Sequence, residues 1–374
     1  MAYGTINTDK LVGSSGGTLS PDSGVFRNRI INGAMVIDQR NAGASVTPTN
    51  GQYTLDRWAA GLTQASKYTI QQTPSATESG YATRVAAGFS NYLAATVGAS
   101  ASVTVGTTDY FYLQQPIEGY NTADLAWGTA NAKPITLSFW VYSSVTGTYG
   151  GSLKSTGSGR SYPFTYTISS ANTWSQISIN IAGDTSGTWN TTNGIGINLT
   201  FGLGVGSNYT GSAGTWASAN YLSATGASNW ISTNSATFYL TGVQFEKGST
   251  ATSFDYRPYG TELQLCQRYY AQMNSVGGYN SVFGAGYCDT STAVRIYTPL
   301  PVQMRSTPTV TASAGNTFYV GSTAGTTCSA FTAQSATVNG ISNQFTTTGQ
   351  TAGQGALMRD NNTTSAYIAA SSEL

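Results

Sequence analysis

The chain has 374 residues, enough for two or three domains with a sizeable buried core. Only 8% of its residues are charged, against roughly 25% in an average soluble domain, while glycine alone contributes 44 residues. Hydroxyl and amide groups must therefore keep it soluble, a composition typical of β-rich extracellular or particle-borne proteins. Its 16 basic and 15 acidic residues form no run of like charge, which argues against nucleic acid as a partner.

The absence of histidine excludes whole classes of chemistry. Ser-His-Asp and Cys-His catalysis both need an imidazole base, and the commonest zinc sites need an imidazole ligand. The three cysteines, Cys266, Cys288 and Cys328, form no CxxC pair. We expect buried, reduced thiols, and a bridge between Cys288 and Cys328 is the alternative.

Residues 1–27 are rich in glycine, serine and threonine, and the N-terminus lacks the apolar core of a signal peptide. We interpret this segment as an extended attachment arm. No stretch approaches the roughly 18 apolar residues of a membrane span, so membrane insertion is not expected.

From residue 28 to 258, period-2 alternation and short β-branched or aromatic runs predict strands separated by turn residues. In Ile135-Thr-Leu-Ser-Phe-Trp-Val-Tyr142, the residues Ile135, Leu137, Phe139 and Val141 fall on one face, which is expected to be core. This region is therefore predicted to be one large antiparallel sandwich. The predicted strands are 29–37, 67–72, 102–105, 111–115, 135–142, 174–181, 196–203 and 236–246.

Residues 261–270 form a short predicted helix between segments with strand patterns, so residues 259–270 are interpreted as a linker. Residues 271–374 are predicted to form a second, smaller β-sandwich. The segment 298–308 carries three prolines, which favours a crossing between sheets over a central strand. The predicted strands here are 281–286, 293–298, 309–312, 317–320, 330–333, 344–347 and 365–369.

The acidic residues do not suggest a hydrolase, because glycoside hydrolysis needs two carboxylates flanking the scissile bond. Asp38 and Asp56 stand out, but each precedes an arginine within two residues. An ion pair or a backbone hydrogen-bond clamp is the expected role of both. No EF-hand pattern occurs, although a structural calcium ion remains compatible with a sandwich, and no cofactor is expected.

Aromatic rings could bind sugars, because an apolar sugar face stacks on a flat ring while amides and hydroxyls take the sugar hydroxyls. Trp140 and Trp174 lie in predicted strands and are expected to pack internally. Isolated rings among small polar residues are the better candidates, and they occur in 206–230 and 277–287. The candidate ligand-binding residues are Tyr209, Trp216, Tyr221, Trp230, Tyr279, Phe283 and Tyr287.

Four motifs follow one another between residues 28 and 270. They are Asn28-Arg-Ile-Ile-Asn-Gly-Ala-Met35 with its continuation to Gly43, Tyr53-Thr-Leu-Asp-Arg-Trp58, Ala236-Thr-Phe-Tyr-Leu-Thr-Gly-Val-Gln-Phe-Glu-Lys-Gly248, and Phe254 to Tyr270. Together, in this order, they resemble tail-fibre or receptor-binding structural proteins of tailed bacteriophages. Met304 to Thr311 and Tyr367 to Leu374 resemble the C-terminal domain common in the same family.

The resemblance implies a jelly roll similar to a carbohydrate-binding module. Ala34 and Gly242 stand where such modules often have acidic residues, which weakens the case for calcium. Beside the resemblance, Asn32-Gly33 is expected to mark a bulge or sheet switch. Arg57 and Arg257 are expected to pair with Asp56 or Asp255.

The implied function is that of a non-enzymatic virion component, assembled in the bacterial host cytoplasm. It would be a tail fibre that forms a homotrimer and binds a host surface polysaccharide during adsorption. Residues 1–27 would contact another virion protein, and residues 271–374 would meet the receptor. The alternatives are a head fibre or capsid decoration protein and a polysaccharide depolymerase. The missing histidine and the lack of paired carboxylates disfavour the depolymerase.

Overall fold

The computed structural model describes residues 11–12, 18–19, 26–75, 78–157, 159–322 and 325–374. Most of the expected attachment arm, 1–27, lies outside the described residues, apart from a pairing of β1 (Leu11–Val12) with β2 (Thr18–Leu19). The rest is almost entirely β-structure, which confirms the all-β prediction. Within the described residues, no helix has the length and apolar character needed to cross a membrane.

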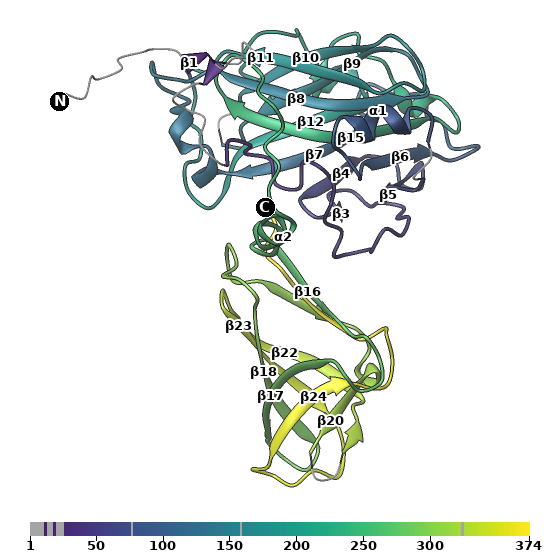
Figure 1. Cartoon of the computed structure of the whole chain (residues 1–374), viewed down its shortest axis with the longest axis vertical. Coiled ribbons are helices and arrows are strands. Elements are labelled where there is room, and N and C mark those ends of the chain that lie inside the picture. The colour runs from purple at the N-terminus through teal and green to yellow at the C-terminus, as the bar shows by residue number, and fades with distance from the viewer. Residues whose placement is uncertain (1–10, 13–17, 20–25, 76–77, 158, 323–324) are drawn as a thin grey trace, which may run out of the picture.

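The first part of the chain folds as two facing antiparallel sheets (Figure 1). Strands close in sequence are distributed between the two sheets, as in a jelly roll. The six-stranded sheet, in spatial order, contains β10 (Ser161–Ile168), β9 (Gly147–Lys154), β12 (Ile195–Val205), β7 (Tyr110–Glu118), β4 (Trp58–Leu62) and β3 (Tyr53–Leu55). The five-stranded sheet contains β11 (Ser175–Ile181), β8 (Ile135–Ser143), β15 (Thr237–Lys247), β6 (Leu93–Val97) and β5 (Tyr68–Gln72).

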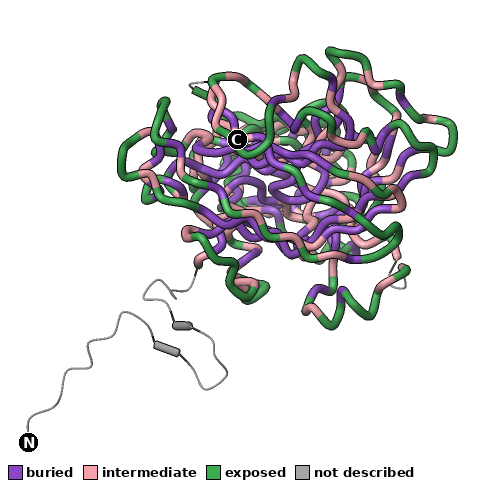
Figure 2. Tube along the Cα trace, turned by 90° about the horizontal axis from the view of Figure 1, so that it is seen from above, coloured by how far each residue is buried: buried purple, intermediate pink, exposed green. Residues whose placement is uncertain are grey.

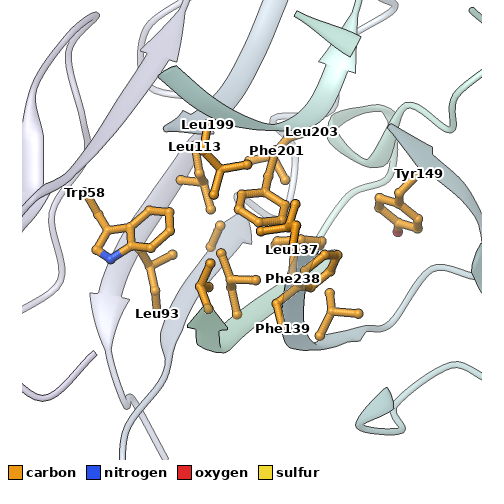
Figure 3. Packing of buried hydrophobic residues seen from close by; sticks show 14 of the residues in the cluster. Trp58, Leu93, Leu113, Leu137, Phe139, Tyr149, Leu199, Phe201, Leu203 and Phe238 are labelled. Carbon is orange, nitrogen blue, oxygen red and sulfur yellow. The ribbon is translucent and has the colours of Figure 1, made fainter. Parts of the chain in front are cut away.

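The core of this sandwich forms between the inner faces of the two sheets (Figures 2 and 3). The four apolar residues of β8 that were expected to face the core, Ile135, Leu137, Phe139 and Val141, are all fully buried, which confirms the alternation. Phe139 meets Phe201 of the opposite sheet edge to face, with ring centroids 5.0 Å apart. Such pairs add to the stability gained from apolar burial.

Two predicted strands, 29–37 and 102–105, are wrong. Asn32 and Met35 have positive φ angles of 59° and 57°, so the first segment cannot run as an extended strand. Side-chain amides hold it instead: Asn28 donates to the carbonyl of Val243 and accepts the N–H of Phe245. The second segment is bonded to the loop before β15 and joins no sheet.

Residues after 258 build a second β-body below the sandwich, joined to it through α2 (Tyr259–Gln267) (Figure 1). Its three-stranded sheet contains β16 (Tyr270–Asn274), β25 (Tyr367–Ser371) and β19 (Thr309–Ala312). Its seven-stranded sheet contains β21 (Thr326–Thr327), β20 (Phe318–Gly321), β24 (Gly355–Asp360), β17 (Val282–Cys288), β18 (Ala293–Pro299), β23 (Gly340–Thr346) and β22 (Ala330–Thr337). The prediction for 298–308 is confirmed, since this segment links β18 in one sheet to β19 in the other.

The remaining elements are short. They are α1 (Tyr81–Ala86), the parallel pair β13 (Thr210–Gly211) and β14 (Ser223–Ala224), and the 3-10 turns Gly119–Asn121, Ala123–Leu125, Ser207–Tyr209, Trp230–Ser232 and Gly315–Thr317.

All three cysteines are free and buried, as expected. The alternative of a bridge between Cys288 and Cys328 is wrong, because the Sγ of Cys328 lies 4.0 Å from the Sδ of Met358, and the Sγ of Cys288 faces Gln350. Burial raises the pKa of Cys328 to about 12, which leaves this thiol protonated and unreactive.

The two bodies meet at a buried charge cluster beside α2. The carboxylate of Glu373 binds Arg57 of the first body, whose side chain is 1% exposed, and also binds Arg40 at 2.7 Å. Tyr269 covers the guanidinium of Arg57 at 3.6 Å. Arg268 pairs with Glu118 at 2.6 Å on the same side. Charged groups this deeply buried need their partners in place, so the cluster fixes how the two bodies join.

Replacing Glu373 by alanine is expected to cost about 3–5 kcal/mol, because the buried Arg57 would lose its counter-charge. Urea unfolding followed by circular dichroism measures the loss. The control is Asp124→Ala, whose pairing with Arg29 is solvent-exposed and worth less than about 1 kcal/mol. Equal stability of the two variants would show that Glu373 is not a structural counter-ion.

Candidate functional site

The outer face of β8 carries aromatic side chains where a solvent-facing strand surface would usually be polar. Trp140 and Tyr142 point away from the core, since their neighbours Phe139 and Val141 point into it. Tyr142 lies directly opposite Tyr239 of β15. The two rings stack almost in parallel, with centroids 4.7 Å apart and planes inclined by 9°.

Five rings share this face, and we call them the aromatic patch: Tyr92, Trp140, Tyr142, Trp174 and Tyr239. Tyr92 contacts Tyr239 at 4.8 Å, and Trp174 contacts Tyr142 at 5.6 Å. Tyr92, Tyr142 and Trp174 are buried, whereas Trp140 and Tyr239 are partly exposed. The patch therefore has a rigid buried base and two rings that reach solvent.

Polar side chains line the open edge of the patch. Three exposed residues of the edge strand β11 face this side: Gln176, Ser178 and Asn180. They lie opposite Trp140, Ser138 and Thr136 of β8, respectively. Residues directly opposed across an antiparallel pair point to the same side. A row of amide and hydroxyl groups therefore runs beside the rings.

The segment 78–89, which contains α1, closes the other side of the patch. Arg84 and Glu78 form an ion pair of 2.7 Å whose side chains are 1% and 4% exposed. The indole N–H of Trp174 donates to Glu78, and the guanidinium of Arg84 lies 5.0 Å from the centre of the Tyr92 ring. The two charges neutralise each other, so the patch presents rings and neutral polar groups.

Burial raises the pKa of both Tyr142 and Tyr239. Their phenol groups therefore keep their protons throughout the neutral range. The hydroxyl of Tyr142 donates to Asn172 at 3.1 Å. Protonated phenols and exposed amides can both donate and accept hydrogen bonds, which matches the hydroxyl groups of an uncharged sugar.

The four aromatic candidates in 206–230 do not form one site. Trp230 is fully buried in the sandwich core and meets Tyr68 edge to face, so its assignment as a ligand contact is corrected to a core role. Tyr209 packs edge to face on Tyr110. Tyr221 lies over Gly211, where a Cβ atom would fall 2.2 Å from its ring.

Trp216 belongs to a cluster of three tryptophans with Trp127 and Trp189. Its indole N–H donates to the carbonyl of Ala182 at 2.8 Å. The hollow beside Trp127 and Trp189 has a volume of about 10 Å³, room for one water molecule and far too little for a sugar. This cluster seals the edge of the core.

In the second body, Phe283 is buried against Phe318, so its assignment is likewise corrected to a core role. Tyr279 and Tyr287 are 41% and 48% exposed. They remain available to a ligand, on a different body from the aromatic patch.

The aromatic patch was not among the predicted sites, because Trp140 and Trp174 were expected to pack inside the protein. The usable signal was the alternation in 135–142. Once one face of that strand is assigned to the core, Trp140 and Tyr142 must lie on the other.

The acidic residues singled out in the sequence have structural roles. Asp38 accepts the backbone N–H groups of Asn41 and Gly43, which confirms the backbone clamp. Asp56 accepts the N–H of Gln39 at 2.7 Å, and burial raises the pKa of Asp56 to about 6.

The expected pairing of Arg57 and Arg257 with Asp56 or Asp255 is wrong. Arg57 binds Glu373 and Arg257 binds Glu262, since these carboxylates lie closer in the fold. Across the described residues, no three acidic or cysteine side chains are placed to hold a metal ion.

No known family model matches the chain, and no curated protein matches its sequence. Among solved structures, an enzymatically active domain of bacteriophage CBA120 tailspike protein 4 aligns with 12% identity and a TM-score of 0.33, over 59% of this chain and 22% of that chain. The family 11 carbohydrate-binding module from Clostridium thermocellum, bound to a mixed-linked tetrasaccharide, aligns with 12% identity and a TM-score of 0.27, over 56% and 98%. TmCBM61 in complex with β-1,4-galactotriose aligns with 8% identity and a TM-score of 0.28, over 59% and 99%.

The docking of α1 should depend on the buried ion pair. Replacing Glu78 by alanine leaves Arg84 buried without a counter-charge, so segment 78–89 is expected to detach while the sandwich stays folded. Hydrogen exchange of the amides in 81–89 should accelerate at least tenfold. Asp289→Ala, which breaks the exposed pair with Arg295, is the control. Unchanged protection of α1 in Glu78→Ala would contradict this role of the pair.

Proposed function

We propose that this chain is a glycan-binding structural protein of a tailed-phage virion, a tail fibre that binds a host surface polysaccharide. The observation that carries the binding function is the aromatic patch with its polar edge. The virion role rests on the ordered motifs between residues 28 and 270.

The chemistry of the patch favours an uncharged sugar chain. Pyranose rings have apolar faces that stack on partly exposed rings such as Trp140 and Tyr239. Gln176, Ser178 and Asn180 extend along β11 for about 13 Å, at roughly 3.3 Å per residue. A surface of this length suits an extended chain better than a single sugar.

We further propose that the protein acts by binding and not by catalysis. Its lack of histidine and the structural use of Asp38, Asp56 and Glu78 support this proposal. Incubation with the bound polysaccharide should release no reducing ends, and measurable release would favour the depolymerase.

A homotrimer attached to the virion through residues 1–27 completes the proposal. Light scattering should give a mass of about three chains, and a single-chain mass would overturn the trimer. Immunolabelling of virions should mark the tail, whereas label on the head would favour the head-fibre alternative.

Trp140→Ala is expected to weaken polysaccharide binding by at least tenfold, because truncating a central ring of a binding surface costs about 2 kcal/mol. Affinity electrophoresis against a panel of neutral bacterial polysaccharides and glucans measures the effect. Tyr120→Ala is the matched control, since Tyr120 is 60% exposed and lies outside the patch. Failure of the wild-type chain to bind any member of the panel, or equal binding by Trp140→Ala, would contradict the proposed site.

Binding should be nearly independent of pH between 6 and 9. A phenol is neutral below its pKa, and burial moves the pKa of Tyr142 and Tyr239 upward, so neither ring ionises in this range. Calorimetric titrations at three pH values test this. A loss of affinity near pH 8 would indicate that a different group controls binding.

A further inference from the structure

The outer face of the seven-stranded sheet is open surface in this chain. Val282 and Tyr287 on β17 are 57% and 48% exposed, and Tyr297 on β18 is 55% exposed. Exposure of this size shows that no described segment packs over them. Their strands lie side by side in the lower body (Figure 1).

Arg359 of β24 lies between residues of the two neighbouring strands on this face. It is directly opposite Tyr319 of β20 on one side and Val282 of β17 on the other. Its chain neighbours Met358 and Asp360 are fully buried, so the side chain of Arg359 points outward with Tyr319 and Val282.

Among the described residues, the charge of Arg359 is unpaired. Every arginine from Arg29 to Arg305 donates to a carboxylate or to a backbone carbonyl. Arg359 has no such partner among the described residues, and neither does Arg27. The Nε of Arg359 is buried without an acceptor. Both carboxylate oxygens of Asp360 are taken by the backbone N–H groups of Tyr279 and Ser281, at 3.0 and 2.7 Å.

Tyr319, the strand neighbour of Arg359, packs against a second ring. Tyr279 and Tyr319 meet edge to face, with centroids 5.1 Å apart, and Tyr279 is 41% exposed. Residue 321 is glycine, and a Cβ atom there would lie 3.6 Å from the Nε of Arg359. Glycine at this position therefore adds no side chain beside the guanidinium, whose Nε is already buried.

A planar guanidinium binds a carboxylate through two parallel hydrogen bonds, and an adjacent phenol ring can carry the apolar edge of a sugar. We propose that Arg359, together with Tyr279 and Tyr319, forms a second sugar site that binds a carboxylate-bearing sugar, of the uronic or sialic acid class. This site lies on a different body from the aromatic patch, whose charged residues are paired. It does not depend on the proposed function of the patch.

The test follows the Nε–Hε NMR signal of Arg359 in the full-length, arginine-labelled protein. D-glucuronate, D-galacturonate and N-acetylneuraminate are the probes, with methyl glucoside and inorganic sulfate as comparisons. At least one acidic sugar should shift the Arg359 signal to saturation at millimolar concentration, while methyl glucoside should not, and sulfate should bind at least fivefold more weakly. Raising the salt concentration should weaken the response.

Two variants separate charge from geometry. Arg359→Gln should abolish acidic-sugar binding, measured by ligand-observed NMR. Arg359→Lys should weaken it at least fivefold, because lysine keeps the positive charge but cannot donate two parallel hydrogen bonds to a carboxylate. Arg295→Gln is the matched control, since Arg295 is on the same face but paired with Asp289, and it should bind as the wild type does.

The proposal is wrong if none of the three acidic sugars shifts the Arg359 signal. It is also wrong if methyl glucoside or sulfate shifts that signal as strongly, or if Arg359→Gln binds as the wild type does. The patch is judged separately by the affinity of Trp140→Ala for neutral polysaccharide, so failure of one site is distinguishable from failure of the other.

Discussion

The two-residue period of β8 places both the core and the aromatic patch. Burying Phe139 and Val141 between the sheets forces Trp140 and Tyr142 onto the outer face. The five-stranded sheet thus gains stability from one set of residues while exposing another. Because Trp140, Tyr142 and Tyr239 lie on strands whose inner faces pack in the core, their positions are held more firmly than those of rings on a loop.

Few charged residues are present, and several of them form buried ion pairs that hold parts of the structure together. Arg57 with Glu373 joins the two bodies, and Arg84 with Glu78 docks α1 on the sandwich. Such buried pairs cost desolvation, so they contribute more to the definition of one arrangement than to net stability. Among the described residues, Arg359, like Arg27, has no carboxylate or carbonyl partner, and its place between Tyr319 and Val282 favours a binding role.

Strands with clear alternation, such as 135–142 and 309–312, were predictable because their inward residues are apolar. β9 (Gly147–Lys154) was not, since its central glycines have low strand propensity. Tertiary packing requires the glycine there, because a Cβ atom at Gly150 would lie 2.2 Å from the Oγ of Ser223 in the short strand β14. Likewise, the alternation of 29–37 was overridden by the positive φ of Asn32 and by amide bonds to a strand more than 200 residues later.

The sequence by itself determined the all-β class, the exclusion of histidine chemistry, the buried cysteines and the sheet crossing at 298–308. Those properties follow from composition and short-range pattern. Only the tertiary structure decided which rings meet and which charges pair, because such contacts join residues distant in the chain. Tyr142 contacts Tyr239 because the strand register places them opposite each other. Arg57 pairs with Glu373 and not with its neighbour Asp56, because folding brings the carboxylate of Glu373 to the guanidinium.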